Sequence, residues 1–296
     1  MIKVVRLSHA ELETHDPTRL AEFYTSIFGL AEMGKDKDRV FLGTSTGQLA
    51  LVLRHSSNTG CSKATFQVAP QIELSEVTRS LQAKGIAAKA QPDPAPGIGK
   101  LITFDDANGT TIEICNEGQL VAPNKRAASA ILPLKLGHLA FRVKDLHATT
   151  KFYTDVLGFR VSDWRKDIYA FLRCGPDHHT MNIVAGDRPK LHHMAFEVRD
   201  GSALLAASDF LGVNGLQIEW GPGRHIIGGN MFVYFRNPDA NIMELYADMA
   251  QMKHEELGAF EVRPWHWDRP YRPKDWPPST LSNLWGPPPP ASIREG

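Results

Sequence analysis

Two stretches of the chain alternate apolar and polar positions in the way expected of half-buried β-strands. The apolar face of residues 136–143 carries Leu139, Phe141 and Val143. His138 falls on the opposite face, and residues 193–198 repeat the alternation in the same phase, with His193 at the equivalent position. The pattern therefore predicts that His138 and His193 lie on corresponding faces of two equivalent strands.

A helical stretch follows each of these strands, and shorter strand-like stretches come next. This order of strand, helix and several strands occurs four times along the chain, at about residues 4–54, 62–117, 135–185 and 190–248. The sequence therefore predicts an α+β protein of four βαβββ modules. We expect them to pair into an N-terminal domain at residues 1–120 and a C-terminal domain at residues 134–248.

The N-terminal and C-terminal halves repeat one sequence pattern. The clearest repeats are Leu7–Ala10 with Leu136–Leu139, and Phe23–Leu30 with Phe152–Phe159. At three aligned positions the N-terminal half has His9, Lys63 and Glu113, whereas the C-terminal half has His138, His193 and Glu244. Two imidazoles and a carboxylate can hold a divalent metal at one face, and a histidine, an ammonium and a carboxylate do so much less well. We therefore interpret His9 and Glu113 as remnants and expect a functional metal site in the C-terminal half only.

The C-terminal half also carries polar residues that its counterpart lacks. Tyr234 aligns with Thr103, and residues 91–100, which align with the surroundings of His225, contain no histidine. Residues that served only the fold would be expected in both halves. The difference therefore places the candidate chemistry in the C-terminal domain.

The last part of the chain differs in composition from the repeats. Residues 249–296 hold four of the six tryptophans and nine of the twenty prolines. Because tryptophans are poor residues to leave in water, we expect this tail to pack over the C-terminal domain. Four arginines, one of the barrel and three of the tail, offer a site for a substrate carboxylate, although surface solvation is the commoner use of arginine: Arg224, Arg263, Arg269 and Arg272.

Composition limits the classes of partner. Lysine plus arginine and aspartate plus glutamate are equal at 33 each, so the net charge gives no attraction to nucleic acid or to an anionic membrane. The N-terminal residues show no signal-peptide pattern, and no apolar run reaches membrane-spanning length. The three cysteines are widely spaced and form no metal-binding pair. We expect a cytoplasmic protein with reduced thiols and a small-molecule partner.

The strongest local signal is a run of polar residues near the end of the C-terminal domain. Gly223-Arg224-His225 is followed by Tyr234-Phe235-Arg236-Asn237-Pro238, and then by Asn241-Ile242-Met243-Glu244. This run resembles the signature of type I extradiol ring-cleavage dioxygenases of the vicinal oxygen chelate superfamily, in which a histidine, a tyrosine, an Asn/Asp-Pro turn and a ligand glutamate follow one another. In that superfamily βαβββ modules pair so that their sheets curl into an open barrel around a metal.

The resemblance implies a role for six residues of this chain. His138, His193 and Glu244 are implied as metal ligands, His179 as the acid–base catalyst, and His225 and Tyr234 as contacts to substrate oxygens. It also implies Fe(II) as the metal, with Mn(II) as the alternative in the same ligand set. A small catechol-type substrate, dioxygen and a homo-oligomeric assembly complete the implied picture.

The sequence leaves several alternatives open. His178 competes with His179 for the acid–base role, and His192 is expected to point to the opposite side of its strand from His193. Aromatic residues in strands pack in the core more often than they line a pocket, which applies to Trp164, Phe171 and Trp220. The rival functions are a glyoxalase-type or epimerase-type metalloenzyme of the same superfamily, and a metal-free protein that sequesters an aromatic compound.

Overall fold

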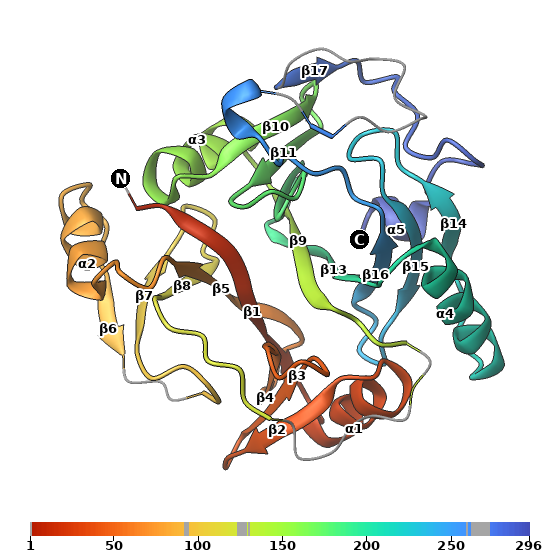
Figure 1. The fold of residues 1–296 in the computed structure, drawn as a ribbon, viewed down its shortest axis with the longest axis horizontal. Helices are drawn as coiled ribbons and strands as arrows, with labels where there is room; N and C mark the ends of the chain where they lie inside the picture. Colours follow the sequence, from red (N-terminus) through yellow and green to blue (C-terminus); the bar gives the residue numbers. More distant parts are fainter. Residues whose placement is uncertain (1, 92–94, 123–128, 130, 259, 262–272) are drawn as a thin grey trace. The chain divides into compact units, whose positions relative to one another are not determined.

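The computed structural model describes residues 2–91, 95–122, 129, 131–258, 260–261 and 273–296. The chain divides into two compact units. Unit 1 comprises Met1–Leu136 together with the short segments Asp155–Gly158 and Asn237–Asp239, and unit 2 comprises the remainder. Figure 1 traces the elements of both units in chain order.

Unit 1 contains two βαβββ modules. The first consists of β1 (Val4–Thr14), α1 (Pro17–Glu22) with the π-helical turn η1 (Phe23–Ile27), β2 (Ala31–Lys35), β3 (Arg39–Gly43) and β4 (Leu49–His55). The second consists of β5 (Gly60–Val68), α2 (Leu74–Gln82), β6 (Lys89–Gln91), β7 (Leu101–Asp105) and β8 (Thr111–Cys115). Within the described residues their strands form one eight-stranded sheet in the order β2-β3-β4-β1-β5-β8-β7-β6.

Unit 2 repeats this architecture. Its first module consists of β9 (Lys135–Val143), α3 (Leu146–Leu157), β10 (Arg160–Arg165), β11 (Tyr169–Arg173) and β12 (Met181–Ala185). Its second consists of β13 (Lys190–Glu197), α4 (Gly201–Val213), β14 (Trp220–Arg224), β15 (Met231–Arg236) and β16 (Ile242–Ala247). Four βαβββ modules in a mixed α+β fold confirm the predicted fold class, whereas the exact domain boundaries stay a prediction.

Aspartate residues begin the helices that follow the first strand of three modules. The side chain of Asp200 accepts a hydrogen bond from the backbone N–H of Ala203 at 2.8 Å, and Asp145 accepts one from Ala148 at the same distance. Asp16 has the same role at the start of α1, where it accepts from the N–H of Arg19. These caps satisfy backbone donors that a helix leaves free at its N-terminus, so the chain turns from strand to helix at defined points.

The residues after β16 add to the sheet of unit 2. They form η2 (Glu255–Leu257), β17 (Lys274–Trp276) and α5 (Ala291–Arg294). β17 pairs parallel with β10, which makes a nine-stranded sheet in the order β14-β15-β16-β13-β9-β12-β11-β10-β17 among the described residues. Ile293 of α5 packs in a buried cluster with Trp220 and Phe232. The described part of the tail is therefore built into unit 2 and contributes to its core.

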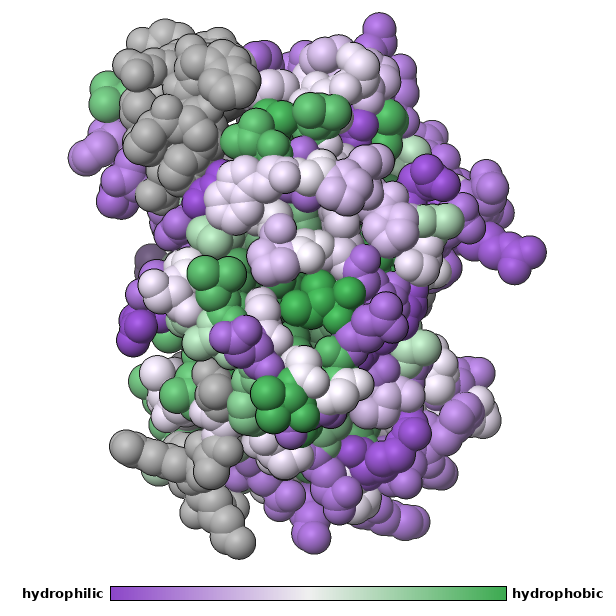
Figure 2. All heavy atoms as spheres, turned by 90° about the vertical axis from the view of Figure 1, so that its right-hand side faces the viewer, coloured by the Kyte–Doolittle hydropathy of each residue, from purple (hydrophilic) through white to green (hydrophobic). Residues whose placement is uncertain are grey.

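Apolar side chains on the face shown in Figure 2 lie in separate groups between hydrophilic ones. Exposed apolar residues of α4, such as Leu205 and Val213, are isolated cases of the kind that most proteins carry.

No helix in the described part of the chain is long and apolar enough to cross a membrane. The three cysteines, all of them described, form no disulfide with one another.

Candidate active site

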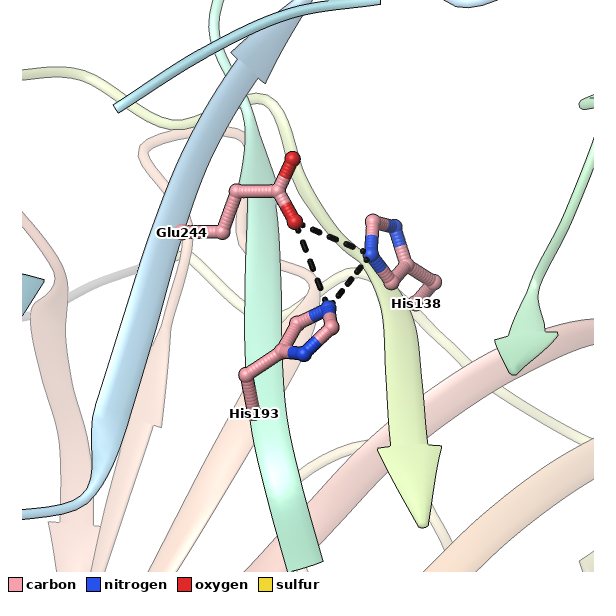
Figure 3. Close-up of side chains that lie close together, drawn as sticks. All are labelled: His138, His193 and Glu244. Atoms are coloured by element: carbon pink, nitrogen blue, oxygen red, sulfur yellow. Dashed lines mark hydrogen bonds and ion pairs between the residues drawn. The ribbon is translucent and has the colours of Figure 1, made fainter. Parts of the chain in front are cut away.

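Three side chains from three strands of unit 2 meet in its interior (Figure 3). His138 of β9 and His193 of β13 place their Nε2 atoms 3.2 Å apart, and each lies close to Oε2 of Glu244 on β16, at 3.2 and 3.3 Å. The strand order β16-β13-β9 makes the three strands neighbours. Three residues spread over more than a hundred positions of the chain therefore present one donor atom each to a common point.

The geometry of this cluster fits a metal ion. Metal–nitrogen and metal–oxygen bonds of about 2.1 Å at right angles place neighbouring donor atoms about 3 Å apart. The three separations in the cluster match that spacing and correspond to three ligands on one face of an octahedron. Each of the three side chains is buried, and their donor atoms form a group that can hold a metal ion.

Burial and hydrogen bonding give the cluster the protonation states that a metal requires. Burial raises the pKa of Glu244, but hydrogen bonds from His138 and His193 outweigh this effect and hold it well below its usual range. Burial also lowers the pKa of His138. An ionised carboxylate and a neutral imidazole are the forms in which these side chains coordinate metals.

Two further side chains orient the carboxylate of Glu244. The hydroxyl of Tyr234 donates to Oε2 at 2.7 Å, and the amide of Asn230 donates to Oε1 at 3.1 Å. Tyr234 lies opposite Glu244 in the antiparallel pairing of β15 with β16. Burial raises the pKa of Tyr234 well above its usual range, so the phenol keeps its proton and acts as a donor. Asn230 was not among the residues predicted from the sequence.

His225 lies beside Tyr234 in a fixed tautomer. Its Nδ1 lies 2.7 Å from the carbonyl oxygen of Ser282, which only accepts, so the ring proton sits on Nδ1. Its Nε2 lies 3.3 Å from the hydroxyl of Tyr234. Because burial lowers the pKa of His225, Nε2 carries a lone pair and is an acceptor.

His179 lines the cavity beside the cluster, with its ring centre 4.4 Å from that of His138. Burial lowers its pKa well below the usual value. Its neighbour His178 is also buried but is not among the described residues that line the cavity. Of the two adjacent histidines, His179 is therefore the one whose ring reaches the cavity.

His192 does not point away from the site as the strand alternation predicts. Its Nδ1 lies 2.7 Å from Nδ1 of His193, and both rings line the cavity. Burial lowers the pKa of His192 to about 3, so the ring is neutral. If Nε2 of His193 coordinated a metal, the ring proton of His193 would sit on Nδ1, and His192 could accept it.

The cavity has a volume of about 670 Å³, its open mouth included. Phe171 and Trp220 line it, and Trp220 also packs in the buried cluster with Phe232 and Ile293, whereas Trp164 is not among its described lining residues. The tail supplies the outer wall with Thr280, Leu281, Ser282, Pro289, Ile293 and Arg294. Arg224 is occupied elsewhere, because it donates to the carbonyl of Gly229 at 2.7 Å. Arg263, Arg269 and Arg272 lie outside the described residues.

The matching positions of unit 1 carry an internal ion pair. The ammonium of Lys63 lies 3.1 Å from Oε1 of Glu113, while Thr65 donates to Oε2 of the same carboxylate at 2.9 Å. Nε2 of His9 lies 3.2 Å from the hydroxyl of Thr65. Thr103 stands opposite Glu113 in the pairing of β7 with β8, as Tyr234 stands opposite Glu244. The aligned positions therefore share their place in the fold, but a lysine supplies the positive charge in unit 1.

Comparison with known proteins agrees with this architecture. The family model described as Glyoxalase/Bleomycin resistance protein/Dioxygenase superfamily matches residues 135–245. The iron-dependent extradiol dioxygenase of Rhodococcus jostii (strain RHA1) is 24% identical over 305 residues, which cover 95% of each chain. Metapyrocatechase 2 of Cupriavidus necator is 31% identical over 154 residues, which cover 51% of this chain and about half, 48%, of that relative.

Solved structures share the fold over almost the whole chain. The Mn(II)-bound glyoxalase from Novosphingobium aromaticivorans superposes with a TM-score of 0.85 at 24% identity, covering 99% of this chain and 94% of that one. The extradiol ring-cleaving dioxygenase from B. fuscum superposes with a TM-score of 0.84 at 22% identity, covering 99% and 82%. At this level of identity the similarity shows the fold.

Proposed function

We propose that the chain is an extradiol dioxygenase, because residues 135–245 match the family model of the glyoxalase, bleomycin resistance protein and dioxygenase superfamily. It would open the aromatic ring of a catechol-type substrate beside the diol and incorporate both atoms of dioxygen. The observation that carries this proposal is the row of side chains His225, Tyr234 and Glu244 next to His138 and His193, in which the Tyr234 hydroxyl donates to Glu244 and lies 3.3 Å from Nε2 of His225. Relatives named for extradiol ring cleavage support it.

The proposed metal ligands are His138, His193 and Glu244, whose donor spacing fits an octahedral ion. Three protein ligands on one face of such an ion leave the opposite face for reactants. When bound, Fe(II) would hold both catechol oxygens and dioxygen together and make the phenol more acidic. We propose Fe(II) and take Mn(II) as the alternative, since the order in which divalent metals bind such a ligand set does not by itself select iron.

The chain's own residues would position the substrate and move its protons. Nε2 of His225 carries a lone pair that can accept the O–H of a phenol at the site, and the oxygen of Tyr234 lies beside it. The aromatic walls of the cavity, among them Phe171 and Trp220, can hold the flat ring of the substrate. We assign the acid–base role to His179, because a histidine that lines the cavity can take a phenolic proton and later return one.

The test is turnover of a panel of catechols after anaerobic loading of the purified protein with Fe(II) or Mn(II). We expect a coloured ring-fission product and consumption of one dioxygen per substrate. A protein that is fully loaded with metal and yields no product across a broad panel would refute the proposal. Turnover of a glutathione hemithioacetal without consumption of oxygen would favour the glyoxalase-type alternative, and tight binding of aromatics with no metal uptake would favour a sequestration protein.

Replacement of His179 by phenylalanine separates its role from that of the ligands. We expect His179→Phe to lose turnover while it keeps its metal, since the ring lies outside the His138, His193 and Glu244 cluster. Loss of metal in this variant would instead make His179 a ligand.

We also propose a cytoplasmic homo-oligomer on the basis of the resemblance. Sedimentation of the purified protein will test the oligomeric state, and fractionation of cells will test the location.

A further inference from the structure

A buried series of hydrogen bonds leads away from the cavity behind His179. Nδ1 of His179 lies 2.9 Å from Nδ1 of His178, and Nε2 of His178 lies 3.0 Å from Oδ2 of Asp163 on β10. The exposed fractions are 3% for His179, 2% for His178 and 1% for Asp163. A carboxylate and two imidazoles in series therefore connect the cavity wall to the interior of the sheet.

The direction of these hydrogen bonds follows from the carboxylate at the inner end. Oδ1 of Asp163 accepts the backbone N–H of Lys274 at 3.1 Å, and Oδ2 faces His178. As a carboxylate, Asp163 accepts at both oxygens and has no proton to give. The proton between the two side chains therefore belongs to Nε2 of His178.

The same logic fixes the proton of His179. An imidazole with a single ring proton that donates from Nε2 to Asp163 presents a lone pair at Nδ1, and this is the form in which His178 can accept from His179. Nδ1 of His179 must then be the donor in the 2.9 Å contact, which leaves Nε2 of His179 as the nitrogen with a lone pair. His179 lines the cavity, so the ring that carries this lone pair is one that a substrate in the cavity would contact.

We propose that Asp163 and His178 are positioning residues that hold the proton of His179 on Nδ1 and keep its Nε2 available as the base of the reaction. This inference rests on the proposed function for the identity of the reaction, but the tautomer it assigns does not depend on turnover. The carboxylate orients the first imidazole, and the first imidazole orients the second.

Packing holds both rings in these positions. Phe171 makes edge contacts with the two imidazoles at ring-centre distances of 5.6 and 5.5 Å, and Phe260 covers His178 at 5.0 Å. The backbone N–H of His178 donates to the carbonyl of Ala250 at 2.9 Å. A Cβ atom on Gly228 would lie within 3.4 Å of both rings, so this glycine allows the backbone to pass close to them. Neither ring is free to flip without disturbing these neighbours.

The Asp163 carboxylate depends on the tail of the chain. Its partner Lys274 is the first residue of β17, which pairs with β10 at Asp163 itself. The tail thus supplies the N–H that occupies Oδ1 and leaves Oδ2 for His178. It also fixes the tautomer of His225 through the carbonyl of Ser282, so two histidines at the cavity owe their orientation to tail residues.

The test replaces the carboxylate by an amide of the same shape. In Asp163→Asn, the amide oxygen still accepts from the backbone N–H of Lys274, and the NH₂ group faces His178 as a donor. His178 must then accept at Nε2 and donate from Nδ1 to Nδ1 of His179. Both hydrogen bonds are reversed, and the ring proton of His179 moves to Nε2. We expect kcat to fall by roughly 10²-fold or more, the range of general acid–base catalysis, with KM and metal content unchanged. The matched control is Asp167→Asn, because Asp167 also contacts a histidine, His147, at 3.3 Å, but on the surface. It should turn over like the wild type.

A spectroscopic measurement reads the tautomer without turnover. Full-length protein with ¹⁵N-labelled histidine is loaded with diamagnetic Zn(II), and long-range ¹H–¹⁵N correlation shows which ring nitrogen carries the proton. The signals of His179 are assigned by their loss in His179→Phe. We expect protonation at Nδ1 in the wild type and at Nε2 in Asp163→Asn. A wild-type ring protonated at Nε2, or an unchanged tautomer in the variant, would overturn the inference.

A second pair of variants covers the case in which Asp163→Asn does not fold. The amide of His178→Gln can donate to Asp163 and accept from His179, whereas His178→Leu can do neither. We expect His178→Gln to retain more kcat than His178→Leu at equal metal content, and equal losses would contradict the proposal. If no catechol is cleaved at all but the spectra show the assigned tautomer, the proposed function fails and the positioning of His179 stands.

Discussion

Replacement of Tyr234 by phenylalanine removes one hydroxyl from the candidate site and leaves the ring in place. The hydroxyl donates to Oε2 of Glu244 at 2.7 Å, and both side chains are buried, with exposed fractions of 4% and 1%. The acceptor is ionised, because the pKa of Glu244 is held well below its usual range. A hydrogen bond to a charged group contributes about 1.5–3 kcal/mol to stability. We therefore expect Tyr234→Phe to lower the unfolding free energy of the metal-free protein by about that amount.

Two measurements check this expectation. Calorimetry of metal-free protein should show a fall in Tm of roughly 3–12 °C, given about 2–4 °C per kcal/mol for domains of comparable size. Titration with a divalent metal should show affinity weakened by about 10-fold to 100-fold, since Tyr234 orients a ligand carboxylate. Both effects arise from the same contact to Glu244 and should appear together.

The control is Tyr169→Phe. Tyr169 lines the same cavity, but no hydrogen bond of its hydroxyl is found among the described residues. We expect its change in stability to stay within about 0.5 kcal/mol. An unchanged Tm and metal affinity in Tyr234→Phe, or equal losses in the two variants, would refute the reasoning that the Tyr234 hydroxyl holds the carboxylate of Glu244.

Three further outcomes are expected. Saturation with Fe(II) or Mn(II) at about 100 times the dissociation constant should stabilise the protein by about 2.7 kcal/mol, and calorimetry should show no such gain in His193→Ala. Burial raises the pKa of Glu11, but a hydrogen bond from Arg54 and the charges of Lys63 and Arg54 outweigh it and lower the pKa overall. This group therefore stabilises the protein at pH above its unfolded pKa near 4.5, and the gain is lost as pH falls through the folded pKa. Glu11→Gln should therefore be less stable than the wild type at pH 7, with a deficit that shrinks in urea titrations at acid pH. A Cβ at Gly137 would meet the hydroxyl of Tyr246 at 1.9 Å, so Gly137→Ala should cost about 1–3 kcal/mol in the same unfolding assay.

The metal cluster could be found from the sequence because each of its members sits on a strand with a repeated counterpart. Alternation placed His138 and His193 on equivalent strands, and the aligned Glu113 marked the position of Glu244. The structure brings the three together through neighbouring strands of one sheet. A pattern that repeats within one chain carries information about tertiary contacts that a single strand does not.

The groups around the cluster could not be predicted in the same way. Asp163, which contacts His178, directly follows a register shift in β10 between Val161 and Asp163, and a bulge of this kind leaves no simple mark in the sequence. The carbonyl of Ser282 contributes through its backbone, which any residue type would offer. Alternation fails at His192 because it describes the direction of Cβ and not the torsion that turns the ring toward His193.

Unit 1 shows why its carboxylate survives although lysine replaces one of the two histidines. A buried ionised carboxylate is costly unless a positive charge lies beside it. In unit 1 the ammonium of Lys63 is 3.1 Å from Glu113, so the lysine that replaces a histidine ligand also supplies that charge. Glu113 is therefore more than a remnant, because its charge is balanced and its second oxygen accepts from Thr65. The aligned positions of the two units therefore both place a positive charge next to the carboxylate. In unit 1 this charge is the ammonium of Lys63, and in unit 2 it would be the metal ion that the two imidazoles help to hold.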